Sequence, residues 1–183
     1  MKNFFKHLKV VTKHRYLVFK HCSKCGLFFR GLVHDLSKFS WVEFSESVKY
    51  FKGTGSPISK CREENGYSLC WLHHKGRNKH HIEYWYDNEN KTQMHMPYKY
   101  AVECVCDKLA AAKTYNGKNY TPKENLNYWL KKKDIYQTSE ETKEFFTKVF
   151  SDLCEKKEKE ILNKKYLKNT YKEIVLHNKK DEL

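Results

Sequence analysis

The sequence predicts an all-α fold, and three observations lead to this prediction. Apolar side chains recur at helical spacing, as over residues 3–25, where Phe4, Val11, Val18 and Cys22 share one broad face. The 183 residues include only three prolines and seven glycines, and these fall where helices are expected to begin or end. No segment alternates convincingly as a strand would, so a helical bundle is expected.

Three helices are expected in the N-terminal part of the chain. The first covers 3–25 and should stop at Gly26, since glycine readily adopts the left-handed conformation of a helix C-terminus. A second runs from 27 to about 36. In "SWVE", Ser40 and Glu43 form a capping box, in which each side chain can bond the backbone of the other residue, and this starts a third helix.

The middle of the chain begins with a turn-rich loop at 52–59. A helix is expected over about 61–75, broken near Gly76, and "NKHHIEYW" is expected to form a short helix of its own. After a polar loop, Pro97 suits the first turn of a helix that reaches about Tyr115.

The last third of the chain is basic and is predicted to be helical. "TPKE" at 121–124 is a capping box with proline at the first helical position, and "TSEE" at 138–141 opens a long helix pair rich in lysine. We expect one domain over 1–183, in which a core of about 3–115 is followed by a basic helical extension of about 121–178.

The charge of the chain is strongly positive. The formal net charge is +14, from 36 Lys and Arg against 22 Asp and Glu, and only four of the bases are arginines. A positive field attracts phosphate-bearing ligands. An equally good explanation is a compositional bias towards Lys, Asn and Tyr on a solvated surface. Since no arginine-rich stripe or RNA-binding signature is present, charge alone is weak evidence for a nucleic-acid partner.

The cysteines and the two ends of the chain bear on its compartment. Seven cysteines, no secretory signal in "MKNFFKHLKVV" and no apolar run of about twenty residues favour a cytoplasmic protein with reduced thiols and no membrane span. The final "KDEL" would be a retention address in a secreted protein, but without a signal peptide we expect coincidence. "CSKC" at 22–25 has zinc-compatible spacing, yet at a predicted helix end it is expected to pack as small apolar side chains.

Five places in the chain hold groups that bind divalent metals well. They are His14, the pair His34–Asp35, His74 or its neighbour His73, the pair His80–His81, and Asp107. Divalent cations take imidazole nitrogen and carboxylate oxygen, and a bridging carboxylate can hold two ions close together. Asp107 lies in the apolar stretch "VECVCDKLAAA", where an unpaired carboxylate would be costly to bury, so a cation is the natural compensation.

These motifs resemble the HD superfamily of metal-dependent phosphohydrolases. The resemblance lies in "LVHDLSK", with Ser37 where glycine is usual, in "HHKGRNKHH", and in the aspartate of "VCDKLAAA". More narrowly, "HDLSKF", "NKHHIEYW" and the "MP" at 96–97 are similar to an uncharacterised bacterial and bacteriophage branch. The resemblance covers about residues 10–115 and implies an HD-like helical bundle with extra C-terminal helices.

The resemblance implies a site for one or two divalent transition metal ions, Mn, Fe, Co, Ni or Zn. Asp35 would bridge the ions, and His14, His34 and Asp107 would hold the first of them. The histidines at 74–81 would hold the second.

The choice among those histidines stays open. His74 and His81 would share a face of one continuous helix, and we favour them, although a break at Gly76 would bring His80 back into contention. His73 can simply be a surface residue. Glu103, one turn before Asp107, is expected either to orient a ligand histidine or to be solvated.

The implied activity is hydrolysis of a phosphomonoester or phosphodiester, in a nucleotide or related compound, by a metal-activated water. Asp35 and Lys38 would be the catalytic residues, with Lys38 stabilising charge on a phosphoryl oxygen. Arg77, assisted by Asn78 and Lys79, would bind the substrate phosphate. The alternative is a metal-containing binding protein without catalysis, which captures a phosphorylated ligand or, through its basic C-terminal helices, nucleic acid.

Overall fold

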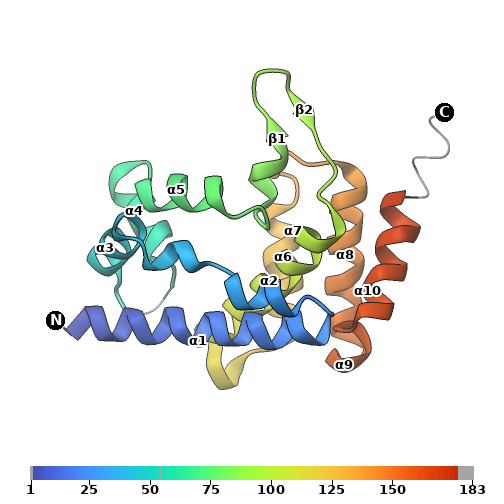
Figure 1. Ribbon diagram of the computed structural model, residues 1–183, viewed down its shortest axis with the longest axis horizontal. Coiled ribbons are helices and arrows are strands. Elements are labelled where there is room, and N and C mark those ends of the chain that lie inside the picture. The colour runs from blue at the N-terminus through green and yellow to red at the C-terminus, as the bar shows by residue number, and fades with distance from the viewer. Residues whose placement is uncertain (1, 54, 177–183) are drawn as a thin grey trace.

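Two long helices form the frame of the molecule. The computed structural model describes residues 2–53 and 55–176, in which α1 (Lys2–Lys24) packs along α6 (Tyr98–Asn116) (Figure 1). As predicted, α1 stops before Gly26, whose φ of +76° is left-handed, and Pro97 directly precedes α6. Because α6 runs through the middle of the bundle and most of its central residues are buried, it presents side chains to the structure on both sides.

The N-terminal helices place a turn against α1. The short helix α2 (Phe28–Val33) packs on α1 so closely that a side chain at Gly31 would lie 2.8 Å from Cys22 Cβ. The expected helix at 27–36 therefore ends at Val33, and His34 and Asp35 lie in the turn that follows. The 3-10 helix η1 (Leu36–Phe39) and helix α3 (Trp41–Tyr50) continue the chain.

The predicted helix over 61–75 is wrong in its extent. Two helices, α4 (Pro57–Asn65) and α5 (Leu69–Arg77), replace it, because Gly66 ends α4 in the left-handed conformation and Ser68 caps α5 by accepting a hydrogen bond from Trp71 N. The expected helix break near Gly76 is confirmed to within one residue, since α5 ends at Arg77.

The stretch "NKHHIEYW" forms a turn and the 3-10 helix η2 (Ile82–Trp85), not a full helix. Beyond it, the strands β1 (Tyr86–Asp87) and β2 (Thr92–Gln93) form a small antiparallel hairpin that projects from the bundle in Figure 1. The sequence analysis predicted no strand here, and two-residue strands are too short to show a period.

The C-terminal third is helical, as predicted. It comprises the 3-10 turn η3 (Gly117–Asn119), α7 (Pro122–Lys132), α8 (Glu140–Glu155), α9 (Glu158–Ile161), α10 (Lys164–Tyr171) and the π-helical turn η4 (Lys172–Leu176). The final "KDEL" lies outside the described residues.

The two predicted capping boxes and the predicted helix start at "TSEE" have different outcomes. Ser40 accepts from Glu43 N at 3.5 Å, but the Glu43 side chain turns instead towards two histidines. Ser139 caps α8 by accepting from Thr142 N, one residue later than "TSEE" suggests. Thr121 precedes α7 without a side-chain capping bond.

The apolar core runs from α1 through α6 to the C-terminal helices. Its largest fully buried side chains include Trp129, Phe145, Phe146 and Phe150, so the basic extension shares one core with the rest of the chain. As predicted, the cysteines of "CSKC" belong to this core as free thiols, and Cys25 Sγ lies 3.9 Å from Cys106 Sγ.

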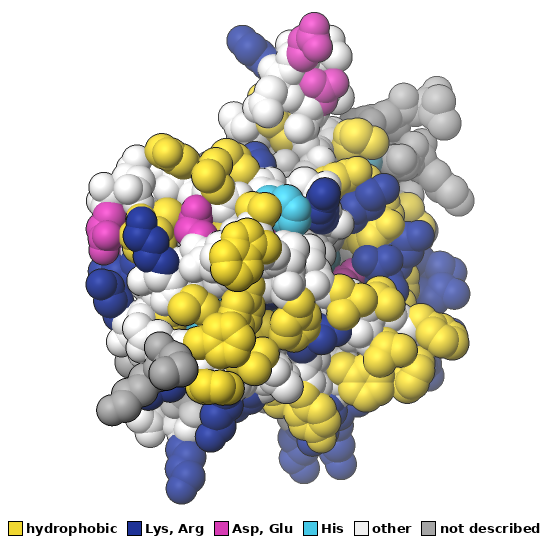
Figure 2. All heavy atoms as spheres, turned by 60° about the vertical axis from the view of Figure 1, so that its left-hand side comes forward, with side chains coloured by type: hydrophobic (Ala, Val, Ile, Leu, Met, Phe, Trp, Pro, Cys, Tyr) yellow, Lys and Arg dark blue, Asp and Glu magenta, His cyan; other side chains and the backbone are white. Residues whose placement is uncertain are grey.

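On the surface, the face in Figure 2 shows Lys and Arg side chains around a broad apolar area, with few acidic groups. Within the described part of the chain, no helix combines the length and the apolar character needed to cross a bilayer.

Candidate metal centre

All seven predicted metal ligands converge in the interior. They come from α1, the turn after α2, α5, the turn after α5, and α6. They form two groups, and in each group the ligand atoms lie within 4.8 Å of one another. The groups are His14, His34, Asp35 and Asp107, and Asp35, His74, His80 and His81.

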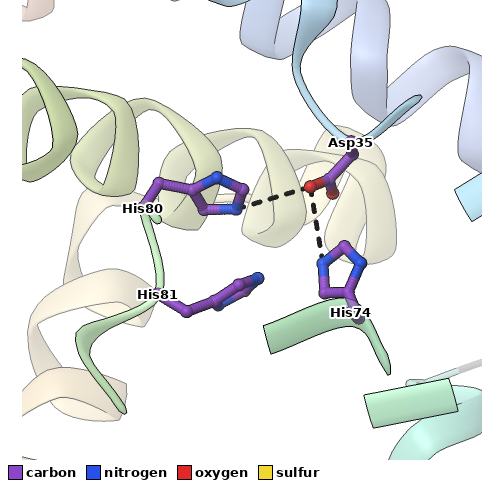
Figure 3. A group of neighbouring side chains, drawn as sticks. All are labelled: Asp35, His74, His80 and His81. Atoms are coloured by element: carbon purple, nitrogen blue, oxygen red, sulfur yellow. Dashed lines mark ion pairs between the residues drawn. The ribbon is translucent and has the colours of Figure 1, made fainter. Parts of the chain in front are cut away.

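Asp35 belongs to both groups, and its two oxygens face different ways. Its Oδ2 atom lies 3.3 Å from His34 Nε2 and 3.9 Å from His14 Nε2. Its Oδ1 atom lies 3.4 Å from the Nε2 atoms of both His74 and His80 (Figure 3). The turn that presents the carboxylate gives Asp35 a left-handed φ of 51°, a conformation that aspartate tolerates better than most residues. The carboxylate is therefore placed to span two ions.

The first group is closed by Asp107 from α6. Its Oδ1 atom lies 3.0 Å from His14 Nε2 and 3.5 Å from His34 Nε2. Three elements that are far apart in sequence thus supply one set of nitrogen and oxygen donors.

In the second group, both His80 and His81 join His74. The sequence analysis favoured the pair His74 and His81 on the face of a continuous helix, but α5 ends at Arg77, so that argument does not apply. The His81 ring packs 4.8 Å from the His74 ring and 4.3 Å from the His80 ring, between centroids, and Figure 3 shows the three converging. His73 stays outside the group, with its Nδ1 atom 2.7 Å from Glu43 Oε1.

Two buried glutamates hold the ligand histidines in place. Glu43 Oε2 accepts from His74 Nδ1 at 2.7 Å. Glu103 Oε1 accepts from His34 Nδ1 at 3.0 Å and lies 3.4 Å from His80 Nδ1. A neutral histidine that donates its Nδ1 proton to one of these carboxylates turns its Nε2 lone pair towards the centre, which is the arrangement that metal-binding histidines prefer.

Of these two glutamates, the sequence analysis named only one as a partner. The orienting role considered for Glu103 is confirmed, and Arg30 forms an ion pair with its other oxygen. Glu43 was missed as a partner because its position in "SWVE" gave it a role as a cap. The structure shows that Glu43 is buried, but the sequence does not reveal that this face of the helix is covered.

The charges of the centre favour cation binding. Burial alone would raise the pKa of Asp35, but the charges of His34 and Lys38 outweigh it and hold this pKa well below the usual value. Burial would likewise raise the pKa of Asp107, and the contacts with His14 and His34 lower it well below normal. Burial lowers the pKa of His14. The centre therefore combines ionised carboxylates with at least one neutral imidazole.

The donor atoms themselves provide a test of whether metal ions fit. His14 Nε2, His34 Nε2, His80 Nε2, His81 Nε2 and Asp35 Oδ1 are buried without a partner in hydrogen-bonding geometry, and Asp35 Oδ2 has only its ion pair with Lys38. A buried polar atom without a partner costs free energy, of the order of 1–3 kcal/mol. All six point to one place, and their chemistry is that of ligands for divalent transition metals. The residues present fit such ions.

A cavity of about 720 Å³ opens onto the centre. Lys38, His14, His81 and Asp107 line it, and Lys38 Nζ lies 2.7 Å from Asp35 Oδ2. The predicted catalytic pair is therefore in contact, with its lysine exposed to the cavity.

The predicted phosphate-binding residues Arg77, Asn78 and Lys79 do not line this cavity. Arg77 and Lys79 are exposed, and Lys79 Nζ lies 5.4 Å from the centre of the Tyr84 ring. Asn78 has a structural contact instead, because its amide donates to His74 O and to Ser37 Oγ and so ties the end of α5 to the turn after Asp35.

A family model matches residues 3–152, which include every residue of the metal centre. The chain belongs to a family of unknown function, DUF5662. Comparisons with curated proteins and with solved structures returned no match.

Proposed function

We propose that this protein is a metal-dependent phosphohydrolase of the HD type, acting on a nucleotide or a related phosphoester. The observation that carries the proposal is the position of Asp35, whose two oxygens face two separate sets of donors. The order of the ligands along the chain, His14, His34–Asp35, the later histidines and Asp107, supports it through the resemblance to that superfamily.

When bound, two divalent ions in such a site supply Lewis acidity to a phosphoryl group and lower the pKa of a shared water to about 7. The chain's own contribution is to hold their ligands. Glu43 and Glu103 keep Nε2 of His74 and His34 directed inward, and Asp35 spans the two sets. Mn, Fe, Co, Ni and Zn all suit imidazole and carboxylate ligands.

Lys38 places a positive charge beside the reacting group. Its ammonium group lies against Asp35 and lines the cavity, so a phosphoryl group at the centre would lie next to it. Burial would lower the pKa of Lys38, but Asp35 and Asp107 raise it above its usual value, which keeps the side chain charged. A fixed charge of this kind stabilises the negative charge that develops on phosphoryl oxygens during attack.

The test is to purify the protein, measure its metal content and screen it against phosphoesters. Wild-type protein should contain a transition metal and hydrolyse at least one phosphoester. Asp35→Asn, which keeps the shape of the side chain, should lose both the metal and the turnover. Asp152→Asn is the matched control, since Asp152 is equally buried but pairs with Lys148 far from the centre, and it should keep both.

Two outcomes would go against the proposal. Protein without transition metal, and without any turnover that depends on Asp35, would overturn it. Metal-loaded protein that carries an intact phosphorylated ligand through purification and hydrolyses nothing would favour the binding-protein alternative.

A further inference from the structure

The cavity is larger than the phosphoryl group alone requires. Its volume of about 720 Å³ falls within the range of roughly 300–1,000 Å³ found for pockets that hold a whole small molecule. Beyond the metal centre, one part of its wall is formed by α6, α7 and the segment after α7, and other parts are formed by α1 and α4. The lining residues there are Lys108, Asn125, Tyr128, Lys132 and Tyr136. The remainder of the substrate would have room against this part of the wall.

Lys108 is held in a defined position on this wall. It follows Asp107 in α6, and its carbonyl accepts a hydrogen bond of 2.9 Å from Asn125 Nδ2. Its ammonium nitrogen lies 5.6 Å from the centre of the Tyr128 ring and 5.3 Å from that of Tyr136. Such cation–π contacts fix the charge in place.

The two tyrosines differ in the ring surface that they leave for a stacked base. One face of Tyr136 meets the Lys108 ammonium, and its ring is also stacked with Trp129 at 5.8 Å between centroids. Tyr128 also has Lys108 over its ring but is 54% exposed. The wall thus offers a ligand positive charge beside one exposed aromatic ring.

The positive charge on this wall has no carboxylate partner. Among residues 2–53 and 55–176, no carboxylate oxygen lies within 4.0 Å of the cationic group of Lys108 or Lys132, whereas Lys38 pairs with Asp35. Glu83 and Glu124 also line the cavity, and in the same part of the chain neither forms an ion pair. Arg62 also lines the cavity and, among residues 2–53 and 55–176, forms no ion pair, so the unpaired cations outnumber the two glutamates. A cavity lining with an excess of unpaired cations attracts anions.

We propose that Lys108 and Lys132 form a second anion subsite, which binds a phosphate other than the one held at the metal centre. The substrate would then carry two phosphate groups, as a nucleoside diphosphate or bisphosphate does. This inference rests on the proposed function for its first phosphate site, and it adds the specificity-determining residues. The subsite itself uses only side chains of α6 and α7.

The test is calorimetric titration of the full chain with AMP, ADP and adenosine 3′,5′-bisphosphate, in excess EDTA to exclude turnover and again with metal present. At least one of the two doubly phosphorylated ligands should bind about tenfold or more tightly than AMP, since a charge-assisted contact contributes at least about 1.4 kcal/mol. Lys108→Gln and Lys132→Gln should each reduce this preference, measured as the ratio of the two affinities, and an unchanged thermal unfolding midpoint shows that each variant is folded.

The matched control is Lys131→Gln, an exposed α7 residue that does not line the cavity, and it should keep the full preference. The inference is overturned if neither doubly phosphorylated ligand binds more tightly than AMP, or if the preference survives in the double variant of Lys108 and Lys132. Phosphoester turnover is measured separately. If wild-type protein prefers the doubly phosphorylated ligands but hydrolyses no phosphoester, the proposed function alone is rejected. If it hydrolyses a phosphoester but shows no such preference, the subsite alone is rejected.

Discussion

The two buried regions on either side of α6 have opposite character. Towards α7 and α8, the interior is packed with the fully buried rings of Trp129, Phe145, Phe146 and Phe150. Towards α1 and α5, it holds histidines and carboxylates whose donor atoms lack hydrogen-bond partners. Burial of the first kind stabilises the fold directly, and burial of the second kind costs free energy unless a ligand compensates it. The polar region therefore does not stabilise the fold as the aromatic one does, and a bound cation of the kind we propose would compensate its cost.

The largest effect on stability should come from the aromatic region. Phe146→Ala, at a fully buried ring, should lower the free energy of unfolding by about 3–5 kcal/mol through lost burial and the cavity left behind. Urea denaturation measures this. Phe29→Ala, at a ring that is 78% exposed, is the control and should change stability by no more than about 0.5 kcal/mol. Folded Phe146→Ala protein should keep its metal, and loss of the metal there would break the comparison.

His21 is a buried histidine outside the metal centre, and it should make the stability of the fold depend on pH. His21 Nε2 accepts from Lys113 Nζ at 3.2 Å, and burial, followed by the charge of Lys113, lowers its pKa from 6.5 to about 4. Above pH 6.5 the imidazole is neutral in both the folded and the unfolded chain. Between pH 6.5 and 4 only the unfolded chain takes up the proton, so stability falls as the pH falls.

This loss should reach up to about 3 kcal/mol in the wild type and be absent from His21→Gln. The stability difference between the two proteins should therefore shrink or change sign between pH 6.5 and 4 and stay constant above pH 7. Urea denaturation in EDTA, which removes any contribution from metal release, measures it. A difference that is the same at both ends of this range would show that His21 titrates normally.

The smallest effect concerns the glutamates behind the ligands. Glu43→Gln and Glu103→Gln should each weaken metal affinity about 10- to 100-fold, because the amide orients the histidine but lacks the charge that increases its basicity. Competition with a chromophoric chelator measures the affinity. Glu63→Gln, at an exposed residue of α4 that pairs with Lys60, should have no effect. Unchanged metal affinity in both variants would mean that the ligand histidines need no support from Glu43 and Glu103.

The sequence alone predicted the helical class, the end of α1 at Gly26, the start of α6 after Pro97, and the seven candidate ligands that converge in the structure. These features follow from local properties, namely the period of apolar residues, the conformational freedom of glycine and proline, and the donor chemistry of histidine and aspartate.

The tertiary structure decided the rest. It split the expected helix at Gly66, brought both His80 and His81 to the centre, turned Glu43 from a cap into a partner of His74, and placed α7 on the cavity wall while leaving Arg77 and Lys79 outside it. Each of these outcomes depends on how elements distant in sequence are rotated against one another. A change of one residue in a helix end turns the following side chains by about 100°, and no local pattern records that rotation.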